Sequence, residues 1–477
     1  MAGQPLSPVT RQDAAGVVAA AIEDLRRALG AAAVLAGDDI PARNEHDWSI
    51  LAPVRPLCVV RPADPAGVAA AMRICAAHRL PVVPQGGLTG LCGGARPVEG
   101  SVALSLERLV GIEEIDAAAA TMTVRAGTPL ETIQKAAADA GLFCALDLGA
   151  RGSCTIGGNL STNAGGNRVI RYGMAREMVL GIEVVLPDGT LMTSLNKMLK
   201  NNAGYDLKQL FVGSEGTLGV ITRAVLRLQP QPACTMAALC GLVGYDAVLA
   251  LLAAARRGLG PLLSAFEVMW PDYWEVATRR VPGVRDPLAG RHAFTVLVEA
   301  QGGDAEGDPQ RFQAWLEAMA EAGVVADAAV ARSLADAAAF WATRDAAAEF
   351  TAVLGPHASF DIGLPVAGMD AYAAECRAAF AAELPGALAL FYGHIADGNL
   401  HIVACLPGAA EQPFAAIDDI VYRLVRRHGG TVSAEHGIGL KKKPFLAFSR
   451  SPEELALMRL IKRAIDPTNR LNPGKVL

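Results

Sequence analysis

The chain has 477 residues, and at about 100–200 residues per domain this length allows two or three domains. Its formal net charge is −5, which provides no basic field for a nucleic-acid partner. Hydrophobic residues make up 52% of the chain and charged residues 19%, a balance that excludes an intrinsically disordered protein.

Cysteines and apolar runs bear on the cellular compartment. The nine cysteines form no CxxC pair, as expected for free thiols in a reducing cytosol rather than for a zinc ribbon. The apolar run Ala14–Ile22 lacks the basic start and cleavage site of a signal peptide. The longest run elsewhere, Ala247–Ala255, is far below the ~18–20 residues that span a bilayer. The sequence therefore predicts a soluble cytoplasmic protein.

The first half of the chain reads as a helical segment at 1–50 and a domain at 51–230. Helices are expected over 12–35, 64–78 and 129–140. Strands are expected over 57–60, 80–83, 102–106, 121–125 and 220–228, with a hairpin at 182–193. Pro230 and Pro232 mark the boundary to the next domain.

The second half reads as a domain at 231–420 and a closing C-terminal segment at 421–477. Strands are expected near 234–240, 263–269, 293–300, 358–364, 388–394 and 400–405. Helices are expected near 245–257, 309–322, 333–350, 369–383, 413–428 and 452–465. This order predicts an α+β domain whose helices cover one side of a mostly antiparallel sheet.

Two long glycine-rich loops stand out in the first domain. The loop at 84–94 follows a strand directly and reads Pro-Gln-Gly-Gly-Leu-Thr-Gly-Leu-Cys-Gly-Gly. The loop at 149–166 adds small hydroxyl and amide side chains to a similar backbone. Consecutive backbone N–H groups without Cβ atoms form a nest suited to a diphosphate. The first loop is not a GxGxxG opening a helix at the chain start, so a Rossmann fold is disfavoured.

These loops, together with the segments 201–207 and 213–222, resemble the FAD domain of the vanillyl-alcohol oxidase/p-cresol methylhydroxylase superfamily. Within it the chain is similar to the D-2-hydroxyacid dehydrogenases, which act on D-lactate, D-2-hydroxyglutarate or glycolate. The likeness runs from about residue 45 to the terminal Asn472-Pro473-Gly474-Lys475. It implies an α+β architecture: a PCMH-type FAD-binding domain, then an antiparallel-sheet substrate domain with flanking helices. The terminal segment would close the active site and return to the FAD domain.

The resemblance also implies which residues bind FAD. The first loop would hold the diphosphate, the second would pass the flavin, and the strand at 215–221 would lie along the nucleotide. The residues implied are Gly86, Gly87, Leu88, Thr89, Gly90, Leu91, Gly152, Ser153, Gly157, Gly158, Asn159, Ser161, Thr162, Ala164, Gly165, Glu215, Gly219, Ile221 and Asn472. Some relatives tether FAD to a histidine or cysteine. The first loop has no histidine, and Cys92 and Cys154 read as packing residues, so we expect non-covalent FAD.

A second constellation lies at 393–401, which reads Gly-His-Ile-Ala-Asp-Gly-Asn-Leu-His. Asp-Gly is the favoured central pair of a two-residue hairpin turn. With Asp397-Gly398 as that pair, His394 and His401 face each other across the strands, with Cβ atoms ~5 Å apart. Two imidazoles at this spacing either bind one ion or form an ordinary polar pair.

The segment Ser433-Ala434-Glu435-His436-Gly437 adds a carboxylate and a third imidazole. Two histidines and one carboxylate leave open positions for a substrate, as catalytic metal sites require. In the family that the chain resembles, the matching residues His394, His401 and Glu435 bind a divalent ion and His436 is the catalytic base. Zinc is the default ion for this set, and manganese is chemically admissible.

The chemistry implied is oxidation of a 2-hydroxyacid. The metal lowers the pKa of the substrate hydroxyl, His436 accepts its proton, and the hydride passes to flavin N5. Arg344, in Phe-Trp-Ala-Thr-Arg-Asp, matches a family position expected to form a fork with the substrate carboxylate. Electrons would pass to a non-oxygen acceptor: a quinone, a cytochrome or an electron-transfer flavoprotein. A homodimer is left open.

Three other functions stay open from the sequence. An oxidase of the same fold would pass the electrons of the reduced flavin to oxygen. A metallohydrolase would use only the His/His/Glu site, and a non-catalytic nucleotide-binding subunit would use only the loops. The histidine and glutamate residues together argue against the last of these.

The substrate can be narrowed by two departures from the family pattern. Relatives that prefer D-2-hydroxyglutarate typically carry Lys-Tyr-Asp where this chain has Ser359-Phe360-Asp361. They also tend to carry asparagine two residues after the second hairpin histidine, where this chain has Val403. Both changes remove polar groups that a second carboxylate needs, although His357 restores positive charge if it points inward. We expect D-lactate or a larger monocarboxylic hydroxyacid, with D-2-hydroxyglutarate as the alternative.

Overall fold

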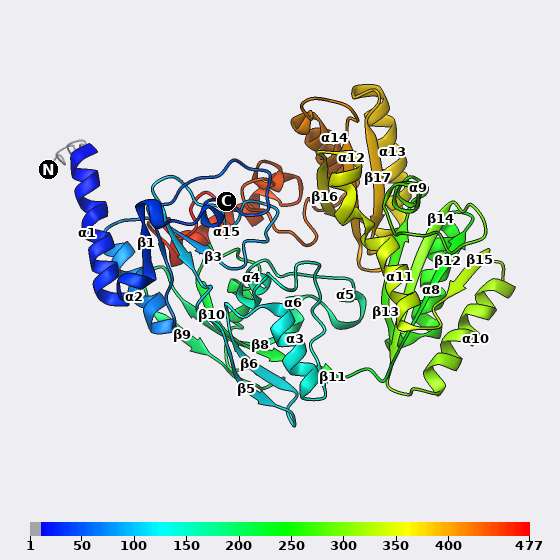
Figure 1. The fold of residues 1–477 in the computed structure, drawn as a ribbon, viewed down its shortest axis with the longest axis horizontal. Coiled ribbons are helices and arrows are strands. Elements are labelled where there is room, and N and C mark those ends of the chain that lie inside the picture. Colours follow the sequence, from blue (N-terminus) through cyan, green and yellow to red (C-terminus); the bar gives the residue numbers. More distant parts are fainter. Residues whose placement is uncertain (1–10) are drawn as a thin grey trace.

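Two sheets build the first lobe of the computed structural model, which describes residues 11–477 (Figure 1). Their strands are β1 (Val34–Ala36), β2 (Cys58–Val60), β3 (Val82–Gln85), β4 (Val102–Ser105), β5 (Ile112–Asp116), β6 (Thr121–Arg125), β8 (Val179–Val185), β9 (Leu191–Ser194) and β10 (Val220–Arg227). One sheet has the order β1-β2-β4-β3, with β2, β4 and β3 parallel. The other is antiparallel, in the order β5-β6-β10-β8-β9.

The helices of this lobe are α1 (Arg11–Leu29), α2 (Pro65–Ala77), α3 (Leu130–Asp139), α4 (Ile156–Ser161), α5 (Val169–Tyr172), α6 (Ala175–Met178) and α7 (Lys208–Phe211). α2 begins where the Asp64 side chain accepts the Gly67 N–H, with proline in the first turn. The first helix ends at Leu29 rather than at residue 35, because Gly30 takes a φ of +87°.

The chain leaves the first lobe after Pro230. β11 (Gln229–Pro230) still pairs with β7 (Leu142–Phe143) of that lobe. The next strand, β12 (Cys234–Leu242), already belongs to the sheet of the second lobe.

A seven-stranded antiparallel sheet forms the second lobe (Figure 1). Its other strands are β13 (Leu263–Met269), β14 (Phe294–Gly302), β15 (Asp327–Val330), β16 (Ala358–Gly363), β17 (Leu388–Gly393) and β18 (Asn399–Cys405). The order is β15-β12-β14-β13-β17-β18-β16.

Helices cover both faces of this sheet, where the sequence predicted cover on one side. One core joins the sheet to α8 (Tyr245–Gly258), α10 (Gly307–Glu321), α13 (Met369–Glu383) and α14 (Phe414–Arg427). A smaller core on the other face joins it to α9 (Pro271–Arg280), α11 (Leu334–Asp345) and α12 (Phe350–Leu354). The alternation of β18 places Leu400, Ile402 and Ala404 in the first core.

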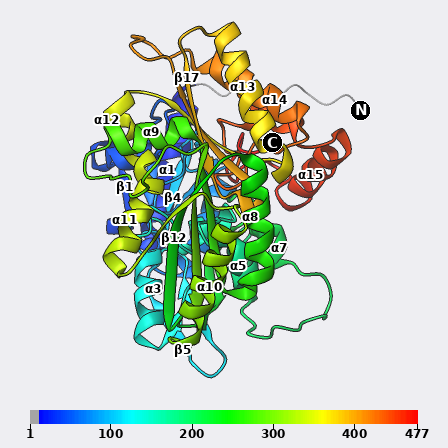
Figure 2. The same ribbon diagram turned by 90° about the vertical axis from the view of Figure 1, so that its right-hand side faces the viewer.

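The terminal segment returns to the first lobe, as the red trace in Figure 1 shows. After α14 the chain passes through a 3₁₀ turn (Lys443–Phe448) and α15 (Pro452–Ile465), a helix on the flank of the molecule in Figure 2. Leu471 then bridges Val82 of β3. No helix within 11–477 is long and apolar enough to cross a membrane.

Most expected elements are present within one to three residues of their predicted bounds. The elements that were not predicted are the strands β1, β5, β7, β11 and β15, the short helices α4, α5, α6 and α7, and the helix α9. The predicted helix at 333–350 is divided into α11, a 3₁₀ turn and the start of α12. Residues 1–10 of the predicted helical segment lie outside the described part of the chain.

Candidate active site

The two hairpin histidines and Glu435 meet as the sequence predicted. The ligand atoms of His394, His401 and Glu435 lie within 4.8 Å of one another. His394 follows β17, His401 lies on β18, and their ring centroids are 5.1 Å apart. Glu435 comes from the segment between α14 and the 3₁₀ turn. Two imidazoles and one carboxylate at this spacing fit a divalent ion, with coordination positions left over.

The hairpin that carries the histidines has a different register from the one predicted. His401 pairs with Tyr392, not with His394. Residues 395–397 form a 3₁₀ turn, and Gly398 follows it with a φ of +88°. The backbone N–H groups of Asp397 and Gly398 donate to the carbonyl oxygens of His394 and Ile395, and these bonds form the 3₁₀ turn. The connection between the two strands is therefore longer than a two-residue turn. His394 still reaches His401 from the end of its strand.

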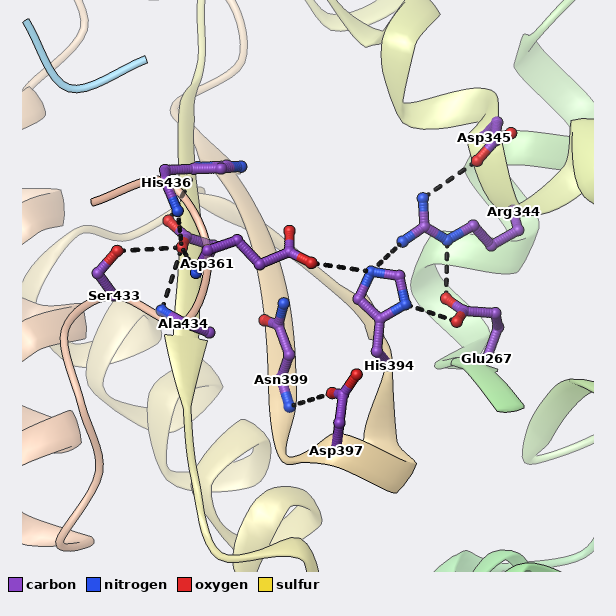
Figure 3. Close-up of polar contacts among 11 residues, drawn as sticks. Glu267, Arg344, Asp345, Asp361, His394, Asp397, Asn399, Ser433, Ala434 and His436 are labelled. Atoms are coloured by element: carbon purple, nitrogen blue, oxygen red, sulfur yellow. Dashed lines mark hydrogen bonds and ion pairs between the residues drawn. The ribbon is translucent and has the colours of Figure 1, made fainter. Parts of the chain in front are cut away.

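A buried glutamate that sequence reasoning missed fixes His394. Glu267 on β13 accepts a hydrogen bond from Nδ1 at 2.5 Å, which leaves Nε2 facing Glu435 at 3.6 Å (Figure 3). Burial alone would raise the pKa of Glu267, but the neighbouring His394 and Arg344 lower it to about 2. A carboxylate that orients a histidine in this way is typical of metal sites. The one available signal was a lone acid in the apolar strand Ala-Phe-Glu-Val-Met.

His401 has a different environment. Burial and the nearby His394 and Arg344 lower its pKa well below the ordinary value. The imidazole is therefore neutral near pH 7, which is the form that binds a metal.

His436 is held by Asp361, another residue whose role was not predicted. The Nδ1 atom lies 2.9 Å from Asp361 Oδ1, while Asp361 Oδ2 accepts the backbone N–H groups of Glu435 and His436 at 2.8 and 2.9 Å. Lys442, 2% exposed, forms an ion pair with the same carboxylate. Burial would raise the pKa of Asp361, but the charges of His436 and Lys442 hold it well below its ordinary value.

Arg344 lies in the site, where each of its guanidinium nitrogens donates one hydrogen bond. Its Nε donates to Glu267 at 2.8 Å and its Nη1 to Asp345 at 3.1 Å. Its Nη2 donates to His394 Nε2 at 2.8 Å (Figure 3). The guanidinium thus contacts the candidate metal-ligand cluster of His394, His401 and Glu435, and its remaining N–H groups are left for a substrate carboxylate.

The two glycine loops pack directly against each other in the first lobe. A Cβ on Gly87 would lie 2.1 Å from the carbonyl oxygen of Ser153, and one on Gly86 would lie 2.6 Å from Thr155 Oγ1. The first loop, residues 86–91, also contains Leu88 with a φ of +62°. Backbone held in this region by a non-glycine residue is common at ligand sites.

Three buried polar atoms without hydrogen-bond partners lie in or next to these two loops. Thr155 Oγ1, Asn159 Oδ1 and Asn472 Oδ1 are buried without a hydrogen-bond partner. Buried polar atoms are normally paired, so these three fit a bound polar ligand, as FAD would be. The remaining residues predicted in the second loop are brought to this region on or beside α4: Gly152, Ser153, Gly157, Gly158, Ser161, Thr162, Ala164 and Gly165.

Four of the predicted cofactor residues have structural partners of their own. Glu215 accepts the N–H groups of Ile438 and Gly439 at 2.7 and 2.8 Å, so its carboxylate joins the terminal segment to the first lobe. A Cβ on Gly219 would lie 2.4 Å from Val184. Ile221, on β10, is buried in the hydrophobic core of the first lobe. Asn472 donates to the carbonyl oxygens of Gly94 and Glu215.

The second loop also reaches the metal-ligand cluster. A Cβ on Gly165 would lie 3.3 Å from Glu435 Oε1. Just beyond this loop, Arg168 forms a two-pronged ion pair with Glu299 of β14, at 2.9 and 3.2 Å. The predicted flavin-side loop and the metal-ligand cluster therefore lie side by side between the two lobes.

Two family models match separate parts of the chain. Residues 56–194 match the family described as FAD binding domain, and residues 231–476 match FAD linked oxidases, C-terminal domain.

Named relatives span almost the whole chain. A D-2-hydroxyglutarate dehydrogenase of Xanthomonas citri pv. viticola is 41% identical over 91% of this chain and 93% of the relative. The mitochondrial D-2-hydroxyglutarate dehydrogenase of Bos taurus is 37% identical over 88% and 76%. A putative mitochondrial D-lactate dehydrogenase of Schizosaccharomyces pombe is 35% identical over 92% and 84%.

Among solved structures, p-cresol methylhydroxylase with bound substrate aligns with a TM-score of 0.78 over 98% of this chain and 97% of that one. The identity is 17%, so this likeness concerns the fold alone.

Proposed function

The chain belongs to the family of FAD-linked oxidases, and from this premise we propose that it is an FAD-dependent dehydrogenase of D-2-hydroxyacids. The observation that carries the proposal is the contact between the second glycine loop and the metal-ligand cluster, at Gly165 and Glu435. A hydroxyacid held at this junction would have its hydroxyl at the cluster and its Cα hydrogen toward the first lobe. That arrangement suits removal of a proton and a hydride from neighbouring atoms.

Bound groups would supply two parts of the chemistry. FAD, held by the two glycine loops without a covalent link, supplies the hydride acceptor. A divalent ion at His394, His401 and Glu435 supplies a Lewis acid for the substrate hydroxyl, with zinc favoured over manganese.

The protein's own residues would move the proton. His436 has its Nδ1 at 2.9 Å from Asp361, so its Nε2 is the atom left to accept the hydroxyl proton. Asp361 would stabilise the resulting imidazolium, and the two backbone N–H groups on its other oxygen keep this carboxylate in place. Glu267 plays the matching part for His394 by fixing its tautomer.

For the substrate we propose a monocarboxylic D-2-hydroxyacid, such as D-lactate or a longer homologue. Ser359 pairs with Val403 across β16 and β18, next to the pair formed by Asp361 and His401. Because side chains alternate along a strand, all four lie on the same face of the sheet. Val403 packs in an apolar cluster with Leu390 and Phe350, so this end of the site offers no evident partner for a second carboxylate.

D-2-hydroxyglutarate is the second candidate. It is favoured by the name of the relative that is 41% identical over 91% of this chain. The acceptor of the electrons is proposed to be a quinone, a cytochrome or an electron-transfer flavoprotein rather than oxygen.

A comparison of kcat/KM for D-lactate and D-2-hydroxyglutarate, with one artificial electron acceptor, tests the substrate. We expect wild type to prefer D-lactate and Ser359→Lys to gain about tenfold to hundredfold on D-2-hydroxyglutarate, the value of one charged hydrogen bond. The control is Ser359→Met, because methionine is similar in length to lysine but uncharged. Its kcat/KM for D-2-hydroxyglutarate should not rise. A wild-type preference for D-2-hydroxyglutarate above about tenfold would reverse the assignment.

A further inference from the structure

Asn399, the first residue of β18, is a buried amide without hydrogen-bond partners for its side chain. It is 4% exposed, and neither Oδ1 nor Nδ2 has a partner. Among residues 15–477, whose side chains the structure describes, no other side chain leaves two such atoms unsatisfied. Because an unpaired buried amide is costly, a group of this kind in a native structure calls for a ligand or another explanation.

The strand directs this amide into the candidate active site. Odd-numbered residues of β18 face away from the main core, which takes Leu400 and Ile402. Asn399 therefore lies on the same face as His401. In Figure 3 its amide lies between Asp361 and His394.

The backbone around Asn399 holds the residue in place but makes no hydrogen bond to its side-chain amide. Its N–H donates to His394 O and to Asp397 Oδ1, both at 3.2 Å. Its partner across the sheet is Gly363, which has no side chain to cover the amide or bond with it. Main-chain contacts thus position the residue, while both polar atoms of its buried amide have no hydrogen-bond partner in the protein.

The two cationic side chains beside the cluster, Arg344 and Lys442, already contact other residues of the protein. Each nitrogen of the Arg344 guanidinium donates to a residue of the protein: Glu267, Asp345 or His394. The Lys442 ammonium is paired with Asp361 and also donates to Ser433 at 3.1 Å. Asn399 therefore adds to the cluster a neutral donor that no residue of the protein uses, beside the N–H groups that Arg344 has left.

We propose that Asn399 is a substrate-binding residue whose Nδ2–H group donates to the C1 carboxylate of the hydroxyacid. This inference rests on the proposed function and adds a residue to it. The amide is neutral, so it orients the carboxylate without adding charge next to the metal ligands. The bond would be present with the 2-hydroxyacid and with the 2-oxoacid product, because both carry the same carboxylate.

The test uses two variants of the whole enzyme. Asn399→Leu removes both polar atoms at similar volume, and Asn399→Asp replaces the donor by a repelling carboxylate. We expect KM for D-lactate and the dissociation constant of pyruvate to rise together, by about tenfold to hundredfold in Asn399→Leu and by more in Asn399→Asp. Flavin content and bound metal should equal those of wild type, and kcat should change much less than KM.

Controls separate the alternatives. Loss of metal in Asn399→Leu would overturn the inference in favour of a metal-holding role. An unchanged pyruvate dissociation constant would overturn it in favour of a structural role. If Asn399→Leu does not fold, Asn399→Ser is measured by the same criteria. A wild-type protein that binds pyruvate but whose flavin no D-2-hydroxyacid reduces would sink the proposed function, while the pyruvate comparison would still decide the role of Asn399.

Discussion

At the scale of single residues, the site depends on two buried carboxylates that each orient a histidine. Asp361 serves His436, and Glu267 serves His394. Both lie on the face of the sheet that meets the first lobe, and both have pKa values lowered by neighbouring cations despite burial. Each carboxylate is therefore charged at neutral pH and can stabilise the histidine that contacts it.

The first prediction concerns Asp361. Asp361→Asn should lower turnover about tenfold to hundredfold, because such orienting partners typically contribute that much. It should also destabilise the fold by about 3–5 kcal/mol, since Lys442 is left buried without its counter-ion. Urea unfolding and steady-state kinetics measure the two effects.

The double variant Asp361→Asn/Lys442→Met is the matched control. It should regain most of the stability, because no unpaired charge remains, but none of the turnover. Recovery of turnover in the double variant would mean that Asp361 acts only through Lys442.

The second prediction separates the metal from the flavin. His394→Ala or Glu435→Ala should remove bound metal and turnover while FAD stays bound, because the glycine loops belong to the other lobe. His428→Ala is the control: it lies at the end of α14 and contacts Glu375, away from the cluster. Metal analysis and the visible spectrum of each purified variant provide the readout. Flavin lost together with the metal in His394→Ala would contradict the division of the site.

At the scale of elements, an ion pair joins two central strands of the first lobe. Glu183 of β8 is fully buried and accepts hydrogen bonds from Arg223 and Thr222 of β10, at 2.8 and 2.9 Å. Burial alone would raise its pKa, but these bonds lower it below the ordinary value. The stabilisation from Glu183 is therefore complete above about pH 4.5 and is lost as pH falls through the lowered pKa of the folded state.

The third prediction follows from the lowered pKa of Glu183 in the folded state. Glu183→Gln should destabilise the protein by about 1–3 kcal/mol at pH 7, the cost of losing hydrogen bonds to a charged group. The difference between wild type and variant should shrink as pH drops below about 4.5. Urea unfolding across pH 3.5–7 measures it, at roughly half-unit steps. A difference that stays constant over this range would rule out the linkage.

Sequence patterns predicted the elements well where a local rule applied. The alternation of β18 and the chemistry of Asp397-Gly398 placed the two histidines together. The register was wrong, because the competition between a two-residue turn and a 3₁₀ turn is decided by backbone bonds at His394 and Ile395. Glu267 was missed because it is 127 residues from His394 in sequence and no local pattern ties the two together.

At the scale of the whole molecule, one short segment joins both lobes and carries the site. Glu435 and His436 are anchored by Asp361 of the second lobe. Ile438 and Gly439, which follow in the same segment, are anchored by Glu215 of the first lobe. The distance between the metal ligands and the flavin-side loop therefore depends on how firmly this segment is held at both ends. The family resemblance predicted that the terminal segment closes the site and returns to the first lobe, but not that Glu215, which was expected to contact the cofactor, anchors it.

The fourth prediction is that FAD is bound without a covalent link. Cys92 and Cys154 of the two loops are both buried, and burial raises the pKa of the Cys92 thiol to about 12. A thiol that stays protonated is a poor nucleophile. Acid precipitation should release the yellow colour into the supernatant, and colour retained in the pellet would show a tether.

The most direct test of the account is the anaerobic reduction of the bound flavin by D-lactate. We predict that the visible absorbance of the oxidised flavin is lost in wild type with D-lactate and not with L-lactate. The same loss should be absent in Glu435→Gln and strongly slowed in His436→Ala, although both variants keep their flavin. Reduction at the wild-type rate in both variants would contradict the claim that the cluster and the flavin-side loop form one active site.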